Sequence, residues 1–140
     1  MKIEKLKIKG YKYWDLMLHH DQYYLGRCVL WCKRNEVTDL LDMTEEEREE
    51  FWQISSKARD AIRGAFSPDL INYASFSNIT KHLHFHIIPR YKNKVVFGES
   101  TFEDKNFGGS PFPYSTLKVD DALVEKIRGV LKQNLEKQDL

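Results

Sequence analysis

The sequence predicts an α+β fold in which antiparallel strands combine with two helices. Three observations support this class. Four segments are rich in aromatic and branched aliphatic residues, which favour strands. Two other segments repeat apolar residues at helical spacing behind capping or acidic residues. The length of 140 residues and the hydrophobic content of 41% suit one compact globular domain, which we expect to extend over residues 1–140.

The N-terminal part contains three candidate strands. Residues 1–10 are rich in lysine and form either a solvated lead-in or an edge strand. Residues 11–20 and 26–33 flank the turn-like segment HDQYYLG, so we expect them to pair antiparallel. We interpret the tryptophans of the chain as core residues: Trp14, Trp31 and Trp52.

The clearest helix is expected over residues 44–65. Thr44 and Glu47 match a capping box, and acidic residues crowd the first turn, where the helix dipole favours them. Helical spacing predicts a buried stripe of Phe51, Ile54, Ala58 and Ile62.

Two further strands and a second helix are expected in the C-terminal half. The strands cover residues 69–76 and 81–89. Residues 92–118 contain several glycines and prolines and are expected to form an ordered loop. The last helix is expected to start near Asp120 or Asp121, with a buried stripe of Leu123, Ile127 and Leu131.

The charge balance excludes some classes of partner. There are 22 Lys and Arg residues against 21 Asp and Glu residues, so the chain has no global field to hold a nucleic acid or an anionic membrane. No apolar run approaches the ~20 residues of a membrane span, and the charged N-terminus lacks the apolar region of a signal peptide.

Cys28 and Cys32 would lie ~13 Å apart in a strand and cannot pair with each other. These features favour a cytoplasmic protein.

Three histidines alternate within one predicted strand: His82, His84 and His86. Alternation places their side chains on one face of the sheet and leaves the apolar residues between them to bury on the other. Three interpretations compete. The rings are surface or hydrogen-bonded histidines, they bind a metal ion, or they carry phosphoryl chemistry. Alternate residues of a strand are ~6.6 Å apart, whereas Zn–N bonds are ~2.1 Å, so one ion could take two neighbouring rings but hardly all three.

Phosphoryl chemistry uses all three rings. A neutral imidazole is available near pH 7 and can attack phosphorus to form a phosphoramidate. Neighbouring rings can stabilise the charge that builds on the phosphoryl oxygens. The middle histidine, His84, has a helper on each side and is the best placed nucleophile.

At these residues the chain resembles the histidine-triad (HIT) superfamily. HLHFHII matches the alternating His signature of that superfamily, and Pro89-Arg90 often follows it. GRCVLWCKRN, TDLLDMTEEE and LINYASFSN resemble other blocks of the family in the same order, so the resemblance is strongest over residues 14–92. It implies the HIT fold, one antiparallel sheet of about five strands with two main helices, and a homodimer.

The resemblance also implies roles for individual residues. His84 corresponds to the nucleophile and His86 to the histidine beside the scissile phosphate and leaving group. The backbone carbonyl of His82 corresponds to the group that holds the nucleophile's Nδ1–H, so that Nε2 is free. Further matches are to substrate-binding positions: Asn72 and Asn78 at the phosphate oxygens, and His19 at the ribose. Each of these three could instead be an ordinary turn or hairpin residue.

The chain departs from the family pattern at three positions. Arg27 replaces a usual histidine, and it could hold a phosphate or lie exposed at the surface. Asn35 replaces another histidine, and Ser77 replaces a usual glycine. These changes leave the nucleophile in place, but they affect what can be expected for the catalytic rate, the leaving group and the natural substrate.

The sequence therefore predicts a hydrolase for the α-phosphate of a nucleotide, acting through a covalent nucleotidyl-histidine. The family's usual substrates are purine nucleotides, as dinucleoside polyphosphates or nucleoside phosphoramidates. No metal or other cofactor is expected at the nucleophile, although Mg²⁺ can accompany a polyphosphate substrate. The alternatives are a nucleotide-binding protein without turnover, a zinc-dependent hydrolase that uses two of the triad histidines, and a deadenylase of nucleic-acid ends. The balanced charge argues against the last.

Overall fold

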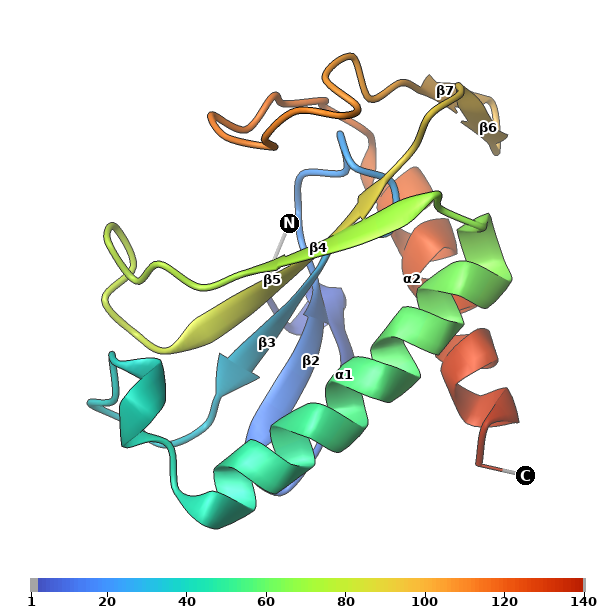
Figure 1. Cartoon of the computed structure of the whole chain (residues 1–140). Helices are drawn as coiled ribbons and strands as arrows, with labels where there is room; N and C mark the ends of the chain where they lie inside the picture. Colours follow the sequence, from blue (N-terminus) through green and yellow to red (C-terminus); the bar gives the residue numbers. More distant parts are fainter. Residues whose placement is uncertain (1–2, 140) are drawn as a thin grey trace.

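An antiparallel five-stranded sheet organises the computed structural model, which describes residues 3–139 (Figure 1). After a short 3-10 helix, η1 (Ile3–Leu6), the strands are β1 (Lys7–Gly10), β2 (Trp14–Leu18), β3 (Cys28–Cys32), β4 (Leu70–Ala74) and β5 (His84–Arg90). Their order across the sheet is β1-β2-β3-β5-β4. β5 therefore enters between β3 and β4, and β1 and β4 form the two edges.

Two long helices pack on one face of the sheet: α1 (Glu45–Phe66) and α2 (Asp121–Lys137). Thr44 caps α1, and Thr44 and Glu47 form the predicted capping box. Asp120 caps α2, so both helices begin within one residue of the predicted positions. Among the described residues, neither helix is long and apolar enough to cross a membrane.

The core lies between the helices and the sheet. Trp14, Leu16 and Leu30 of the sheet are at most 2% exposed and belong to the same apolar cluster as Ile54 and Ile62 of α1. The predicted stripe of α2 is buried in that cluster too. The α+β class, the antiparallel sheet and the two main helices are thus confirmed.

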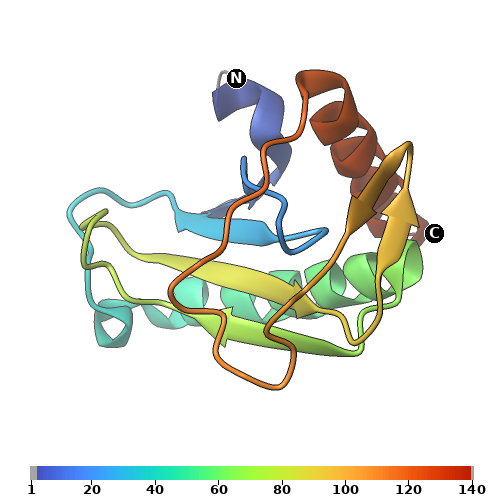
Figure 2. The same ribbon diagram turned by 90° about the horizontal axis from the view of Figure 1, so that it is seen from above.

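The other face of the sheet is covered only in part. Residues 103–120, which lead into α2, cross in front of the strands while α1 lies behind them (Figure 2). We call this segment the strap. Its position leaves part of this side of the sheet uncovered, between η1, the strap and the central strands, and we call this part the open face.

The expectations for residues 92–118 and for Trp52 are wrong. Residues 92–118 are not all loop, because β6 (Val95–Phe97) and β7 (Ser100–Phe102) form a hairpin. That hairpin packs on the helix layer, where Phe97 contacts Phe66 and Phe102 is buried. Trp52 is not a core residue: it points away from the buried stripe of α1 and is 73% exposed.

Both cysteines are free and buried, as expected for thiols without a disulfide partner. Cys28 and Cys32 point from β3 into the core, and burial raises the pKa of the Cys28 thiol to about 12. They therefore act as small apolar core residues.

Candidate active site

Strand β5 presents His84 and His86 on the open face, whereas His82 lies two residues before the strand begins and not within it as predicted. Leu83 and Ile87 are fully buried, and Phe85 packs on Phe51 of α1 at 4.3 Å between ring centroids. Because side chains alternate along a strand, His84 and His86 point away from the helices. This confirms the predicted division between an apolar face and a histidine face.

His84 is held by a carbonyl group on one side of its ring. Its Nδ1 lies 2.6 Å from the backbone oxygen of His82. Since a carbonyl oxygen only accepts, Nδ1 carries the proton and donates it, which leaves a lone pair on Nε2. His82 in turn donates from Nε2 to the backbone oxygen of Cys32 at 2.6 Å and stacks on Trp31 at 4.3 Å.

His86 is held by a cation. A guanidinium nitrogen of Arg27, Nη2, lies 3.1 Å from Nδ1 of His86. Arg27 lies between Gly26 and the first residue of β3 and is 3% exposed. Its guanidinium stacks on the ring of Tyr114 at 3.9 Å from the ring centroid. Burial, the Arg27 charge and His84 together lower the pKa of His86 to about 3, so its ring is neutral near pH 7. The alternative of a surface-exposed Arg27 is therefore wrong.

His19 joins the same cluster from the end of β2. Its ring centroid is 5.8 Å from that of His86, and its Nδ1 accepts a hydrogen bond from the Asp21 amide at 3.0 Å. Burial, followed by the charge of Arg27, lowers the pKa of His19 to about 3. The structure thus brings together five of the seven residues selected from the sequence: His19, Arg27, His82, His84 and His86.

In the described part of the chain, no hydrogen bond joins Asn72 or Asn78 to the histidines or to Arg27. Asn72 faces the histidine side of β4, but its Oδ1 accepts a hydrogen bond from Arg90 at 2.9 Å. Asn78 is exposed in the loop between β4 and β5. Before it, Ser77 has a φ of 53°, a left-handed conformation that glycine adopts most easily. Ser77, which stands where the resemblance implies a glycine, therefore adopts a backbone conformation that suits glycine.

A groove of about 720 Å³ adjoins the cluster on the open face. Its floor is formed by side chains of β2 and β3, among them Met17, Val29 and Trp31, and η1 forms one wall. Since Trp31 pairs with His84 across the strands and Val29 pairs with His86, the groove leads directly to the two rings. It has the size and the mixed apolar and polar lining of a small-molecule site.

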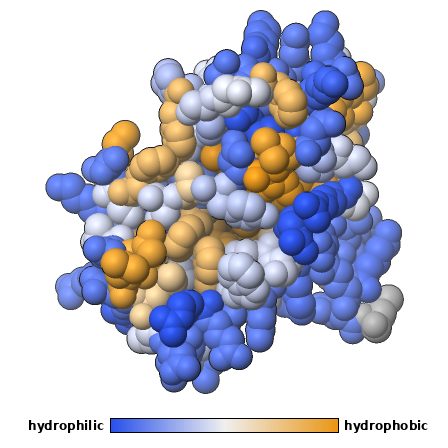
Figure 3. Space-filling view, in the orientation of Figure 1, coloured by the Kyte–Doolittle hydropathy of each residue, from blue (hydrophilic) through white to orange (hydrophobic). Residues whose placement is uncertain are grey.

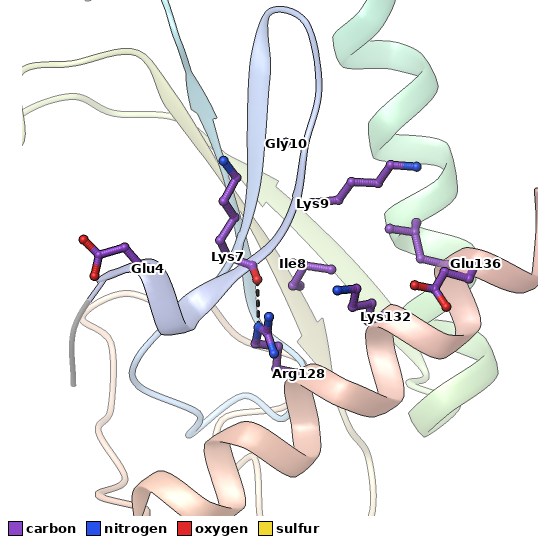
Figure 4. Close-up of a pocket in the computed structure, with 9 residues that line it drawn as sticks. Glu4, Lys7, Ile8, Lys9, Gly10, Arg128, Lys132 and Glu136 are labelled. Carbon is purple, nitrogen blue, oxygen red and sulfur yellow. Dashed lines mark hydrogen bonds between the residues drawn. The ribbon is translucent and has the colours of Figure 1, made fainter.

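A second hollow, of about 440 Å³, lies between β1 and α2 (Figure 4). Three of its basic side chains are already engaged: Lys7 pairs with Asp15 at 3.1 Å, Lys9 pairs with Asp139 at 3.6 Å, and Arg128 donates to the Lys7 carbonyl at 2.7 Å. Glu4 and Glu136 add negative charge to the same surface. We interpret it as a solvated surface of mixed charge.

Two contributors to the candidate site were not selected from the sequence. Trp31 was assigned to the core, yet it is only partly buried and forms the stacking surface for His82. Tyr114 lies on the strap, 30 or so residues after the triad in a region without regular pattern. The alternation of β3 could have placed Trp31 on the open face, whereas no sequence signal indicates Tyr114.

The ring nitrogens that face protein groups are already engaged. His82 uses Nε2 on Cys32, His84 uses Nδ1 on His82, and His86 uses Nδ1 on Arg27. Within residues 3–139, no group of three or more His, Cys, Asp and Glu side chains is arranged to hold a metal ion. The absence of a metal at the nucleophile stays a prediction.

Comparison with known proteins gives consistent matches. The family model of the HIT domain matches residues 17–93. A bis(5'-adenosyl)-triphosphatase from Dictyostelium discoideum is 23% identical over 114 residues, which cover 78% of this chain and 74% of that protein.

Solved structures share the fold at low sequence identity. A histidine triad (HIT) protein from Sinorhizobium meliloti 1021 is 15% identical, with a TM-score of 0.78 over 92% of this chain and 88% of that one. A histidine triad protein from Marinobacter aquaeolei VT8 is 18% identical, with a TM-score of 0.77 over 96% of this chain and 94% of that one.

Proposed function

Because the chain belongs to the HIT domain family, we propose that it is a nucleotide hydrolase in which His84 attacks the α-phosphate. One observation supports this most strongly. The hydrogen bond from His84 Nδ1 to the His82 carbonyl leaves a lone pair on Nε2, which is the state that an imidazole nucleophile needs. The triphosphatase from Dictyostelium discoideum favours the same class of reaction.

The reaction proceeds in two displacements. The Nε2 lone pair of His84 forms a bond to the α-phosphorus, and the bond from phosphorus to the leaving group breaks with its electron pair on that group. Water then attacks the nucleotidyl-His84, the P–N bond breaks, and its electron pair returns to Nε2. The water proton passes to solvent, and a nucleoside monophosphate is released.

The groove beside the cluster suits the nucleoside part of the substrate. Met17, Val29 and Trp31 offer apolar and aromatic surface for a base, and His19 lies between the groove and His86. We assign adenine nucleotides to this site, as dinucleoside polyphosphates or nucleoside phosphoramidates. Mg²⁺ can enter as part of a polyphosphate substrate. The buried free thiols agree with a cytoplasmic location.

Trapping the covalent intermediate tests the proposal. Rapid acid-free quenching during turnover of adenylyl compounds should yield an adenylylated protein that is stable to base and labile to acid, as a P–N bond is. Mass spectrometry should place the adenylyl group on the peptide that contains His84. His84→Ala should lose turnover and the adduct but keep AMP binding in calorimetry, because binding is spread over other groups.

Two results would contradict the hydrolase proposal. One is hydrolysis by His84→Ala at a rate near that of the wild type. The other is AMP binding without an adduct or consumption of any compound in the panel, which would establish a nucleotide-binding protein without turnover.

We also propose that two copies assemble through β4 and α1. A groove of about 560 Å³ lies between these elements, lined by Leu40, Phe51, Trp52, Tyr73 and Phe85. Trp52 is 73% exposed and Tyr73 is 49% exposed, and Figure 3 shows apolar side chains exposed on this face. β4 is also a sheet edge with free backbone groups. A second copy can satisfy that edge antiparallel about a twofold axis and cover the aromatic groove on both chains.

Sedimentation tests this assembly. The wild type should sediment as a dimer, and Trp52→Asp should shift it to monomer because a charge would be buried at the interface. Val96→Asp is the matched control, since Val96 is equally exposed at 71% but lies on the β6–β7 hairpin. A monomeric wild type, or a dimer that Trp52→Asp leaves intact, would contradict the proposal.

A further inference from the structure

We propose that Arg27 is a positioning residue that fixes the proton of His86 on Nε2 and thereby selects phosphoanhydride substrates over phosphoramidates. This inference rests on the hydrolase function proposed above and narrows its leaving group. It depends on the contact of Arg27 with His86, on the burial of Arg27, and on the opposite state of His84.

The contact with Arg27 defines the protonation of the His86 ring. A guanidinium has five N–H donors and no acceptor. Nδ1 of His86, 3.1 Å from Arg27 Nη2, must therefore accept and carries a lone pair. In the neutral ring the proton then lies on Nε2. A doubly protonated His86 would place an N–H against the Arg27 cation, so this contact opposes it.

His84 and His86 consequently have opposite tautomers. His84 has its proton on Nδ1 and a lone pair on Nε2, whereas His86 has a lone pair on Nδ1 and its proton on Nε2. Their ring centroids are 5.1 Å apart and their planes meet at 78°. The lone pair on Nε2 of His84 is thus ready to attack, and the N–H on Nε2 of His86 is ready to donate a hydrogen bond. No proton has to move between the two rings before the reaction starts.

Arg27 also contributes a positive charge that no close ion pair neutralises, since the Asp21 carboxylate acts on it only from beyond ion-pair distance. No carboxylate lies within ion-pair distance of its guanidinium in the described part of the chain, although the residue is 3% exposed. Its Nε and the Tyr114 hydroxyl are buried, and neither has a hydrogen-bond partner among residues 3–139. Tyr114 covers the guanidinium from the strap side. A buried cation with a free donor favours an anionic group at the His86 side of the site.

The leaving group decides whether this arrangement is effective. When a phosphoanhydride is cleaved, the P–O bond breaks with its electron pair on a phosphate oxygen. A phosphate whose second pKa is about 6 departs as an anion, so a hydrogen bond from His86 Nε2 and the charge of Arg27 suffice. When a phosphoramidate is cleaved, the electron pair goes to an amine nitrogen, and a free alkylamine has a pKa of about 10.4. That nitrogen must gain a proton in order to leave.

Neutral His86 is a poor source of that proton. Giving up its Nε2 proton would leave an imidazolate anion, which forms only at strongly alkaline pH. A second proton on the ring is opposed first by burial, then by the charge of Arg27, which contacts the ring from just before β3, and then by His84 of β5. The rings of His19 and Tyr114 also face His86, and neither is a carboxylate that would favour the charged form. The wild-type site is therefore suited to anionic leaving groups.

Paired substrates test the selection. Wild-type kcat/KM for bis(5'-adenosyl) triphosphate should exceed that for adenosine 5'-phosphoramidate by about tenfold or more at pH 7. Arg27→Gln and Arg27→His remove the permanent charge and should raise the phosphoramidate-to-anhydride ratio by about ten- to a hundredfold, through kcat rather than KM. This gain should increase as the pH falls toward 6. Arg27→Lys, which keeps the charge and a donor, should keep the wild-type ratio, as should Arg48→Gln, an exposed arginine of α1.

A measurement without turnover tests the tautomer directly. In the wild type, nitrogen NMR of His86 should show an unprotonated Nδ1 and a protonated Nε2 at pH 7, with His84 showing the reverse. This measurement needs no variant to fold and no substrate to react, so a chain that hydrolyses nothing would overturn the hydrolase function while the tautomer is still tested. A proton on His86 Nδ1 would overturn the positioning role. An unchanged substrate ratio in Arg27→Gln and Arg27→His, or a wild-type preference for the phosphoramidate, would overturn the selection.

Discussion

Asp104→Asn should destabilise the protein strongly, because it removes the charge partner of a buried arginine. Arg90 at the end of β5 is 2% exposed, and the side chain of Asp104 is 1% exposed. Arg90 donates to both Asp104 oxygens, at 2.6 Å from Nε and 3.2 Å from Nη2. It also donates to the carbonyl oxygens of Asn106 and Gly109 and to Asn72, so it ties β4 and β5 to the start of the strap.

The size of the effect follows from what the substitution leaves behind. Removing one partner of a buried ion pair typically costs about 3–5 kcal/mol. Three neutral acceptors still contact the Arg90 guanidinium, so we expect the lower end, about 3 kcal/mol. A chain of this length unfolds with an entropy of about 0.3 kcal/mol/K, so Tm should fall by about 10 °C.

Thermal unfolding followed by circular dichroism measures this change. Glu125→Gln serves as the control, because Glu125 is half exposed and pairs with Arg128 on the surface of α2 at 2.7 Å. The control should lower the free energy of unfolding by at most about 0.5 kcal/mol. If Asp104→Asn changed Tm no more than Glu125→Gln, the Arg90–Asp104 pair would not anchor the strap as argued.

The remaining predictions concern pH, a helix end and metal. The pKa values of His19 and His86 are lowered to about 3, below the unfolded value of about 6.5, so the unfolded chain binds protons first as the pH falls. Their contribution to the free energy of unfolding is complete above about pH 6.5 and should decline toward pH 3, and His86→Asn should flatten a Tm profile between pH 4 and 7. Ser67 ends α1 with a φ of 49°, so Ser67→Gly should raise the free energy of unfolding by about 1 kcal/mol in urea titration; a loss of stability would refute this. Hydrolysis should survive chelation and elemental analysis should find no stoichiometric zinc, whereas loss of activity with loss of bound zinc would favour the two-histidine metal site.

Much of the fold follows from local patterns in the sequence. The capping box at Thr44 and the apolar spacing that follows it define α1 almost to the residue, because helix ends are set by neighbouring residues. The alternation around His84 places the histidines on one face of β5 for the same reason. The β6–β7 hairpin was missed because its strands have only three residues each and depend on packing against Phe66 rather than on their own pattern.

The candidate site was predicted where it depends on β5 and less well where it depends on distant segments. Spacing identified the three histidines, although only His84 and His86 lie in β5, and resemblance to the family added His19 and Arg27. Whether Arg27 was exposed could not be decided from the sequence, because its burial depends on Tyr114 in the strap, 87 positions later. Asn72 faces the expected side, but its partner Arg90 could not be foreseen from their separation in the chain.

The position of β5 between β3 and β4 has a consequence for how the protein loses activity. A strand with paired neighbours on both sides has no free edge from which to fray, so its amides open to hydrogen exchange only when the whole sheet opens. His86, which pairs with Val29 of β3 and Ala74 of β4, therefore keeps its position until global unfolding, whereas His84 at the first residue of β5 pairs only with β3. We expect the amide protons of residues 86–88 to be among the slowest to exchange, and heat inactivation to coincide with loss of the fold rather than to precede it.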